Sequence, residues 1–430
     1  MSEGKRTIVV GGGVAGLCTA YYLAKRGVEV TVLESNRVGS GASAGNGGWL
    51  CPAQAGPLPE PGLTPMGMRA LLNRDSALYF KPSKLAELSP WLVRFWSYCN
   101  SRAYRHGLES LARLGARVFD LVDAMVEEGV KFELHRQGML MASRNLDQLQ
   151  EELTKLQPMR EFGYELPDEI LVDEELRQVE PALAPAVRAG FLVRQHWHVR
   201  PETFNEGVAD AARGLGVEIV EAAEVVDFVV KDSRVAVLRT AAGDREADSV
   251  VLAAGSWTPQ VAARLGVKVP VQAGKGYSFL VEPSVMPQHA ILLADVHVGC
   301  TPFGEGMRIG GTMEFSGVNL HLDRRRIDAT IAGARDSFVE WAKPGVRSEW
   351  AGLRPIAPDG LPVLGRAAPY ENVFIATGYS MQGMTLGPPA GEAMADYVAT
   401  GERPGVLEPF GLDRFRRVPV PRRRNARAGR

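Results

Sequence analysis

The sequence predicts an α/β fold in which an α+β domain with a mixed or antiparallel sheet is inserted into a domain built on a parallel sheet. A strand, a glycine-rich turn, a helix and a second strand follow one another within residues 8–33, which is a complete βαβ unit. Two later segments, Ser249–Ala254 and Val373–Thr377, have the apolar composition of buried parallel strands. Because segments typical of a separate sheet lie between them, we expect the first domain to be discontinuous.

The βαβ unit carries a nucleotide-binding pattern. Gly11, Gly13 and Gly16 form G-x-G-x-x-G between the strand and a helix that Gly27 ends. In a Rossmann-like unit these glycines allow a tight turn, a close approach of backbone to a pyrophosphate, and packing of the helix on the strand. The start of the helix offers N–H groups to phosphates. Glu34 follows the second strand, where a carboxylate accepts both ribose hydroxyls of an adenosine and repels the additional phosphate of NADP.

A strip of small residues, Gly41–Gly48, comes soon after Glu34. A plain NAD domain would continue here with further βα units. Small residues allow a flat ring and a pyrophosphate to lie against the backbone. The strip therefore favours FAD, whose extended form needs a second line of contacts; the alternative is a glycine-rich turn that holds no ligand.

The remaining elements follow from apolar periodicity and from glycine and proline punctuation. Helices are expected at residues 86–129, 148–157, 173–179, 201–215, 323–342 and 391–399. Strands are expected within residues 131–143 and at 217–220, 225–230, 235–240, 269–281 and 307–312.

Composition excludes several classes of function. The formal net charge of −1 gives no global field for nucleic acid or membrane. The four cysteines form no CxxC pair, which argues against a zinc site and a disulfide framework, so we expect no metal and a reducing compartment. No signal peptide is visible and no segment approaches the ~20 apolar residues of a membrane span. These observations predict a cytoplasmic protein.

Two segments leave a peripheral contact with the inner face of a membrane open. Residues 91–98 have an apolar and aromatic face that could meet a membrane quinone pool, although core packing of a helix is the favoured interpretation. The five arginines within residues 422–430 predict a solvated, disordered tail, with a tether to an acidic surface as the alternative.

Together these residues resemble the D-amino-acid oxidase-like family of FAD-dependent oxidoreductases, which includes glycine oxidase and sarcosine oxidase. Within it they resemble most of all the bacterial D-amino-acid dehydrogenases (small subunit). The resemblance extends over nearly the whole chain, to about Phe415. Besides the glycine turn and the small-residue strip, the matching segments are Glu180–Leu183, Ala253–Trp257, Lys275–Ser278, Gly352–Pro355, Pro358–Gly365 and Thr377–Gly378.

The resemblance implies a glutathione-reductase-type FAD-binding domain formed by residues 1–80, 175–262 and 347–415. A substrate domain of residues 81–174 and 263–346 and a basic tail of residues 416–430 complete the chain. Because neither Cys nor His stands at Trp49 or at Gly352–Arg354, FAD is expected to be noncovalent. The residues expected to bind FAD are Gly11, Gly13, Val14, Ala15, Gly16, Glu34, Ser35, Ala42, Ser43, Asn46, Gly47, Gly48, Val225, Ala254, Gly255, Trp257, Gly360, Gly378, Gln382, Gly383, Met384 and Thr385.

The activity implied by the resemblance is oxidative deamination of an amino acid, either a D-amino acid or a secondary amino acid such as a proline derivative. A hydride passes from Cα to flavin N5, and the imine hydrolyses to a 2-oxo acid. Arg354 is the expected anchor, because a guanidinium grips a carboxylate bidentately. An inter-domain salt bridge is the alternative for this arginine.

The other candidate catalytic residues are Tyr277, Tyr379 and His297. The tyrosines are expected to donate to the substrate carboxylate or to line the cavity, with half-buried packing equally open. His297, and with it His196 and His198, is a candidate acceptor for the amine proton, although a structural role is favoured for any single histidine. The sequence departs from the dehydrogenases at Tyr379, where they usually carry histidine, and at residues 195–201, which are more aromatic and basic.

Other functions remain open on the same fold. They are a glycine- or sarcosine-type amine oxidase that uses oxygen, a 2-hydroxy-acid dehydrogenase, and a non-catalytic flavin-binding subunit. The expected partners are a small amino-acid substrate and an electron acceptor, which is oxygen, a quinone or an electron carrier. No nucleic-acid partner is expected.

Overall fold

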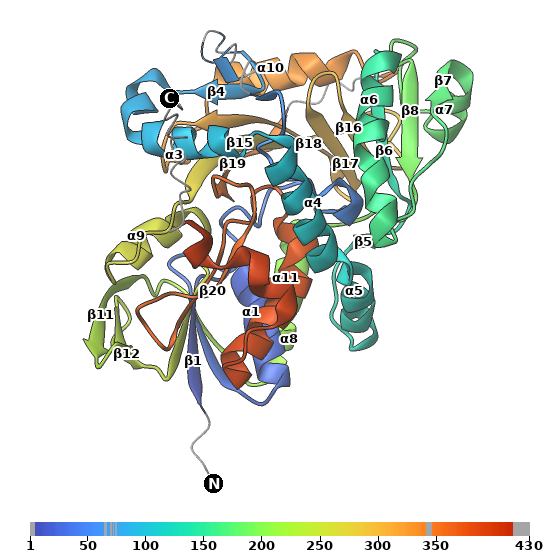
Figure 1. The fold of residues 1–430 in the computed structure, drawn as a ribbon. Helices are drawn as coiled ribbons and strands as arrows, with labels where there is room; N and C mark the ends of the chain where they lie inside the picture. The colour runs from blue at the N-terminus through green and yellow to red at the C-terminus, as the bar shows by residue number, and fades with distance from the viewer. Residues whose placement is uncertain are drawn as a thin grey trace, which may run out of the picture.

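The computed structural model describes residues 5–63, 67–68, 71, 73, 75–340 and 346–415. Its six-stranded sheet lies in the lower half of Figure 1 and has the strand order β10–β2–β1–β14–β21–β20. The first five strands run parallel, and β20 is antiparallel to β21. The strands are β1 (Arg6–Val10), β2 (Glu29–Leu33), β10 (Glu218–Val220), β14 (Ser249–Leu252), β20 (Val363–Arg366) and β21 (Val373–Thr377).

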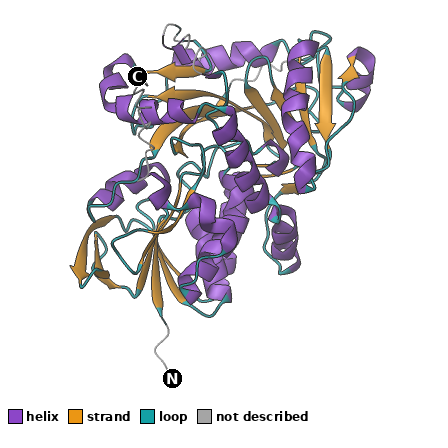
Figure 2. Ribbon diagram, in the orientation of Figure 1, coloured by secondary structure: helices purple, strands orange, loops and turns teal. Residues whose placement is uncertain are grey.

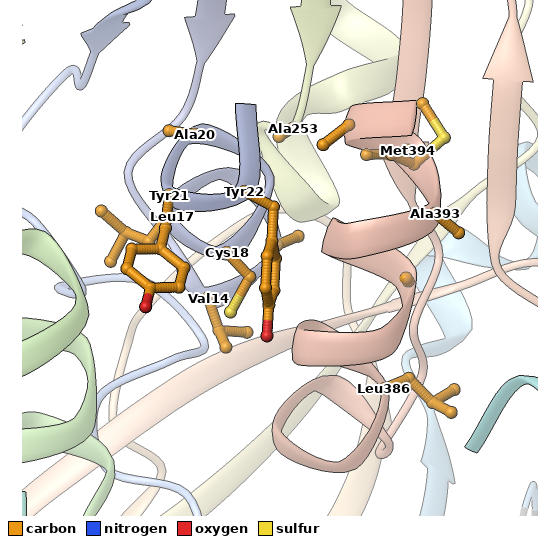
Figure 3. Packing of buried hydrophobic residues seen from close by; sticks show 14 of the residues in the cluster. Val14, Leu17, Cys18, Ala20, Tyr21, Tyr22, Ala253, Leu386, Ala393 and Met394 are labelled. Carbon is orange, nitrogen blue, oxygen red and sulfur yellow. The ribbon is translucent and has the colours of Figure 1, made fainter. Parts of the chain in front are cut away.

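Both faces of this sheet are covered, as the apolar composition of its strands requires. On one face pack α1 (Val14–Lys25), α8 (Pro201–Gly214) and α11 (Gly383–Thr400). Figure 3 shows how closely α1 and α11 approach: a Cβ on Gly391 would lie 2.7 Å from Cβ of Cys18. The other face carries α9 (Thr258–Ala263) and a three-stranded sheet of β11 (Val225–Lys231), β12 (Arg234–Thr240) and β13 (Arg245–Glu246).

The second, nine-stranded sheet fills the upper half of Figure 1, in the order β19–β15–β18–β17–β16–β6–β8–β7 with β4 beside β18. Most neighbours are antiparallel, while β16–β6 and β18–β4 are parallel, so the sheet is mixed as predicted. Its strands are β4 (Leu78–Phe80), β6 (Met139–Ser143), β7 (Leu171–Val172), β8 (Ala189–Val193), β15 (Gln272–Val281), β16 (Ala290–Leu293), β17 (Val298–Phe303), β18 (Gly306–Phe315) and β19 (Arg347–Ile356).

Helices surround the large sheet (Figure 2). They are α3 (Leu85–Tyr98), α4 (Ser101–Gly115), α6 (Leu146–Leu156), α7 (Asp173–Val179) and α10 (Arg324–Arg335). The helix α5 (Val118–Glu127) instead packs in the cluster that contains α1, α8 and α11. A small sheet of β3 (Trp49–Leu50), β9 (Trp197–Val199) and β5 (Leu134–His135) lies near the junction of the two halves. In α3, Trp91, Leu92 and Phe95 are buried, as core packing predicts, while Val93 and Trp96 stay exposed. In the part of the chain that is described, no helix is long and apolar enough to cross a membrane.

Three segments cross the predicted domain boundaries. The strands β4, β8 and β19 pair within the large sheet, although residues 1–80, 175–262 and 347–415 were expected in the cofactor domain. We therefore propose a division into two domains, one built on the six-stranded sheet and one on the nine-stranded sheet. Residues 416–430, for which a disordered tail is predicted, lie outside the described residues.

Candidate active site

A cavity of about 1550 Å³ lies between the two large sheets. It runs from the carboxyl ends of β1, β2 and β14 to the face of the nine-stranded sheet formed by β15, β18 and β19. In open α/β sheets ligands bind at the carboxyl ends of the strands. The predicted nucleotide site and the predicted carboxylate anchor therefore face one continuous space.

The glycine turn between β1 and α1 is closed to side chains. Gly11 has φ +112°, and a Cβ there would lie 2.6 Å from the carbonyl oxygen of Ala253. A Cβ on Gly16 would lie 1.9 Å from the carbonyl oxygen of Gly11. Gly11 and Gly13 line the cavity, as do Val14 and Ala15 at the start of α1, whereas Gly16 packs behind the turn. The backbone is thus exposed to a ligand at the positive end of the helix.

Glu34 is fixed beside this turn. Its Oε2 accepts from the Gly12 amide at 2.7 Å, and its Oε1 accepts from the Asn36 amide at 2.8 Å. Glu34 and Ser35 both line the cavity. Because the backbone holds the carboxylate in place, its remaining lone pairs are oriented for the hydroxyls of a ribose.

The small-residue strip forms a closed loop against the cavity. Asn46 folds it, because its Nδ2 donates to the Ala42 carbonyl at 3.1 Å and its Oδ1 accepts from the Gly48 amide at 2.8 Å. The Ser43 hydroxyl accepts from the Val14 amide at 2.9 Å, which joins the strip to the start of α1. A Cβ on Gly48 would lie 1.8 Å from the Val199 carbonyl oxygen. All the predicted residues of the strip line the cavity.

The structure brings together most of the other predicted cofactor residues. Val225, Ala254, Gly255, Trp257, Gly383 and Met384 line the cavity. Gly360, Gly378, Gln382 and Thr385 do not. Gly360 has φ +75° and packs against residues 57–59. Thr385 donates to the Trp49 carbonyl at 3.0 Å and accepts from the Cys51 amide at 3.1 Å, so it holds β3 in place.

Arg354 on β19 lines the cavity without a carboxylate partner among the described residues. Its Nη1 donates to the Thr312 carbonyl at 2.9 Å. A Cβ on Gly276 would lie 2.1 Å from this nitrogen, so glycine leaves the space that the guanidinium occupies. Burial lowers the pKa of Arg354 to about 10, which still leaves it charged at neutral pH. A charged, uncompensated guanidinium facing a cavity is a binding site for an anion.

Tyr277 borders the cavity, but its hydroxyl is committed elsewhere. It donates to Oε2 of Glu314 at 2.8 Å, and the Nζ of Lys275 lies 3.1 Å from Oε1 of the same carboxylate. Burial acts to raise the pKa of Glu314, but hydrogen bonds from Ser316 and Tyr277 and the charge of Lys275 outweigh it and lower the pKa. The matching segment Lys275–Ser278 thus forms a buried ionic network behind the cavity.

Tyr379 lies at the cavity with its hydroxyl buried and without a hydrogen-bond partner among the described residues. Burial raises its pKa, so the hydroxyl stays protonated. His297 stands in the turn between β16 and β17, has φ +54°, and is exposed at the cavity wall.

The hydroxyl of Tyr379 supports a test, because an orphaned buried hydroxyl costs about 1–3 kcal/mol. We expect Tyr379→Phe to leave the unfolding free energy of the FAD-free protein unchanged or higher, while weakening FAD or substrate binding. Denaturant unfolding of the FAD-free protein and flavin titration measure the two effects. Tyr370→Phe is the control. The Tyr370 hydroxyl donates to the Leu265 carbonyl at 2.8 Å, so its removal should lower the unfolding free energy. Equal destabilisation by both variants would contradict a ligand-facing role.

His196 and His198 do not line the cavity. Burial lowers the pKa of each to about 3. His198 Nε2 lies 3.1 Å from the Pro302 carbonyl oxygen, and its ring stacks on His135. These two histidines are therefore neutral core residues.

Neutral buried histidines make stability depend on pH. The unfolded chain takes up protons below the ordinary histidine pKa of ~6.5, whereas the folded chain does so only near pH 3, so stability falls as pH decreases between these values. We expect His196→Leu to flatten this acid-side loss, because neither ring nitrogen of His196 has a partner among the described residues. Unfolding midpoints from pH 4 to pH 7 measure it. His106→Leu, at an exposed position, should keep the wild-type slope.

Sequence reasoning missed several residues of the cavity. Trp350 shares one face of β19 with Gly352 and Arg354, and a Cβ on Gly45 would lie 2.6 Å from its ring, so it closes the strip against the large sheet. Because alternate residues of a strand share one face, counting back from Arg354 in steps of two could have identified Trp350. Thr312 gave no signal, because its φ of +65° arises from a bulge in the pairing of β18 with β15. Its buried hydroxyl has no partner among the described residues.

The cavity fits FAD. The glycine turn admits only backbone, Glu34 offers a fixed carboxylate to a ribose, and the small-residue strip continues the cavity toward Arg354. A dinucleotide laid along this path would place its pyrophosphate on the turn and its far ring near β15, β18 and β19.

Comparisons with known proteins agree with this geometry. A family model described as "DAO: FAD dependent oxidoreductase" matches residues 6–397. A D-amino acid dehydrogenase from Xylella fastidiosa (strain M12) is 31% identical over 96% of this chain and 95% of its own length. One from Rhizorhabdus wittichii is 30% identical over 95% of this chain and 100% of its own length.

Solved structures share the fold. Glycine oxidase from Geobacillus kaustophilus has a TM-score of 0.73 at 23% identity, over 95% of this chain and 98% of that one. L-Proline dehydrogenase from P. horikoshii has a TM-score of 0.75 at 21% identity, over 97% and 99%. The family match spans both sheets and the whole cavity. The chain therefore belongs to the DAO family of FAD-dependent oxidoreductases, and its cofactor is FAD.

Proposed function

We propose that this enzyme oxidises the carbon–nitrogen bond of an amino acid, either a D-amino acid or a secondary amino acid such as a proline derivative. The observation that carries the proposal is the uncompensated guanidinium of Arg354, which faces the same cavity as the glycine turn. Relatives named D-amino acid dehydrogenase, and folds named glycine oxidase, L-proline dehydrogenase and iminodiacetate oxidase, support an amino-acid substrate.

Arg354 binds the substrate carboxylate through two parallel N–H donors, which fixes rotation as well as position. The Thr312 carbonyl holds Nη1 in place, and Gly276 leaves room for it. Such orientation contributes to catalysis by presenting one C–H bond to its acceptor. FAD, when bound, supplies that acceptor by taking up the hydride and its electron pair.

The chain also controls the proton on the substrate nitrogen. A mostly apolar wall disfavours an ammonium, so the amine is bound neutral and its lone pair is available. His297, exposed at the cavity wall, takes the released proton toward solvent. The Tyr379 hydroxyl binds the FAD or the substrate. The Tyr277 hydroxyl is bound to Glu314, so Tyr277 serves as part of the cavity wall.

Anaerobic mixing of the holoenzyme with a panel of D- and L-amino acids tests the proposal. At least one amino acid should bleach the flavin absorption band. 2-Hydroxy acids are mixed with the holoenzyme in the same way. If they alone bleach the band, the enzyme oxidises hydroxy acids instead. If neither class bleaches it, the chain is a flavin-binding subunit without this activity.

The FAD is proposed to be noncovalent, because neither Trp49 nor Gly352–Arg354 offers a nucleophile to the ring. Acid precipitation should release all of the flavin into the supernatant. We propose a quinone or an electron carrier as the acceptor, by analogy with the relatives named dehydrogenase. Faster reoxidation by oxygen than by a soluble quinone analogue would assign an oxidase instead.

A further inference from the structure

The end of the cavity next to Arg354 is walled by aromatic and apolar side chains. We call Phe80, Trp91, Phe95, Met313 and Phe315 the aromatic box. Phe80 and Phe315 stack with ring centroids 4.9 Å apart, and Trp91 and Phe95 with centroids 5.1 Å apart. These side chains come from β4, α3 and β18, whose positions can be followed in Figure 1. Rings packed in this way form a preformed wall.

The aromatic box begins directly beside the guanidinium. Ile356, two residues after Arg354 on the same face of β19, packs in one cluster with the box. Met313 follows Thr312, whose carbonyl accepts from Arg354. A Cβ on Gly274, which pairs with Arg354, would lie 2.4 Å from Sδ of Met313. The aromatic box is therefore within reach of the substituent of a carboxylate held by Arg354.

Among the described residues, the two carboxylates that line the cavity near the aromatic box are already engaged. Asp75 is held by Arg325 at 2.5 Å, and Glu60 lies 3.8 Å from Nζ of Lys155. A charged substituent would lose its hydration against the rings of the box, which carry no charge to compensate it, whereas an apolar substituent gains from leaving water. The Nε1 of Trp91 is buried without an acceptor among the described residues.

We propose that the substrate carries a large apolar side chain, aromatic or long aliphatic, and that the aromatic box determines this specificity. The amine and its oxidation rest on the function proposed above. The recognition of the carboxylate and of the apolar substituent does not rest on that function, because Arg354 and the aromatic box bind these groups whether or not an amine is present.

Binding of the deaminated skeletons to the holoenzyme tests the proposal. We expect 3-phenylpropionate to bind at least about tenfold more tightly than propionate, since an apolar pocket discriminates single methylenes by roughly 10- to 200-fold. Calorimetry and the shift of the flavin absorption spectrum both report the Kd. Equal affinities for the two acids would overturn the proposal.

Variants of the aromatic box test whether it causes the preference for 3-phenylpropionate over propionate. Phe95→Leu should lower the preference for 3-phenylpropionate several-fold, and Phe95→Ala should lower it further if the protein retains FAD. Phe119→Leu is a matched control, because Phe119 packs on Trp197 with centroids 4.6 Å apart and does not line the cavity. A Phe95→Leu protein with the wild-type preference would overturn the assignment.

Anaerobic reduction by alanine and phenylalanine, each as both enantiomers, separates the two proposals. Faster reduction by one enantiomer of phenylalanine than by alanine supports both. Equal reduction by alanine and phenylalanine overturns the specificity and leaves amine oxidation standing. If no amino acid reduces the flavin but the preference for 3-phenylpropionate persists, amine oxidation fails and the specificity stands.

Discussion

Replacement of Arg354 by alanine should raise the KM for a carboxylate substrate strongly while the protein remains yellow. Removing one partner of a buried charge pair costs about 2–5 kcal/mol, which corresponds to roughly 30- to 5,000-fold in kcat/KM. FAD should stay bound, because Arg354 touches the end of the cavity on β19 and not the glycine turn on β1. Steady-state kinetics and the flavin-to-protein absorbance ratio measure the two effects.

Arg354→Lys is the informative companion. Lysine keeps the charge but lacks the planar pair of donors, so we expect it to restore only part of the affinity. Arg347→Ala is the control, because this arginine at the start of β19 is exposed and pairs with Glu282. An Arg354→Ala enzyme with wild-type KM would remove the central observation on which the proposed function depends.

Replacement of Gly16 by alanine should abolish or severely weaken FAD binding. Its Cβ would lie 1.9 Å from the Gly11 carbonyl oxygen, so the turn or the helix must move. Overpacking of this kind costs about 1–3 kcal/mol, which is roughly 5- to 150-fold in affinity if the turn alone absorbs it. The absorbance ratio of the purified protein and reconstitution with added FAD measure the loss.

Gly214→Ala controls for the change of residue type. Gly214 ends α8, and a Cβ there meets nothing within 4 Å, so the variant should bind FAD as the wild type does. Far-UV circular dichroism of Gly16→Ala separates a displaced turn from a failure to fold. Normal flavin content in Gly16→Ala would show that the close packing of α1 on β1 is not required for the site.

Local patterns were sufficient to predict several elements of the fold. The strand Val373–Thr377 and the helix Asp173–Val179 match the sequence prediction at both ends, because each is bounded by residues that interrupt its pattern. α11 was predicted from residue 391 and begins at Gly383. Pro388 and Pro389 hid its first turns, since proline normally ends a helix, whereas here both lie inside the helix.

The substrate half was less predictable for a physical reason. The Tyr277 hydroxyl was a candidate carboxylate donor, but it meets Glu314, which is 37 residues away, and only the pairing of β15 with β18 brings them together. The Thr312 carbonyl reaches Arg354 at the bulge in the pairing of β18 with β15. Such contacts have no signature at short range in the sequence.

The strand order of the parallel sheet constrains how the protein is made. β1 pairs with β14 through Thr7 and Ser249, and β14 pairs with β21, which ends at Thr377. During synthesis, β1 and β2 can pair early, but their other neighbours, β14 and β10, emerge from the ribosome only about 200 residues later. Contacts so distant along the chain form slowly, and unpaired edges are exposed meanwhile. Nascent chains halted before residue 373 should therefore depend on chaperones and lack a finished nucleotide pocket.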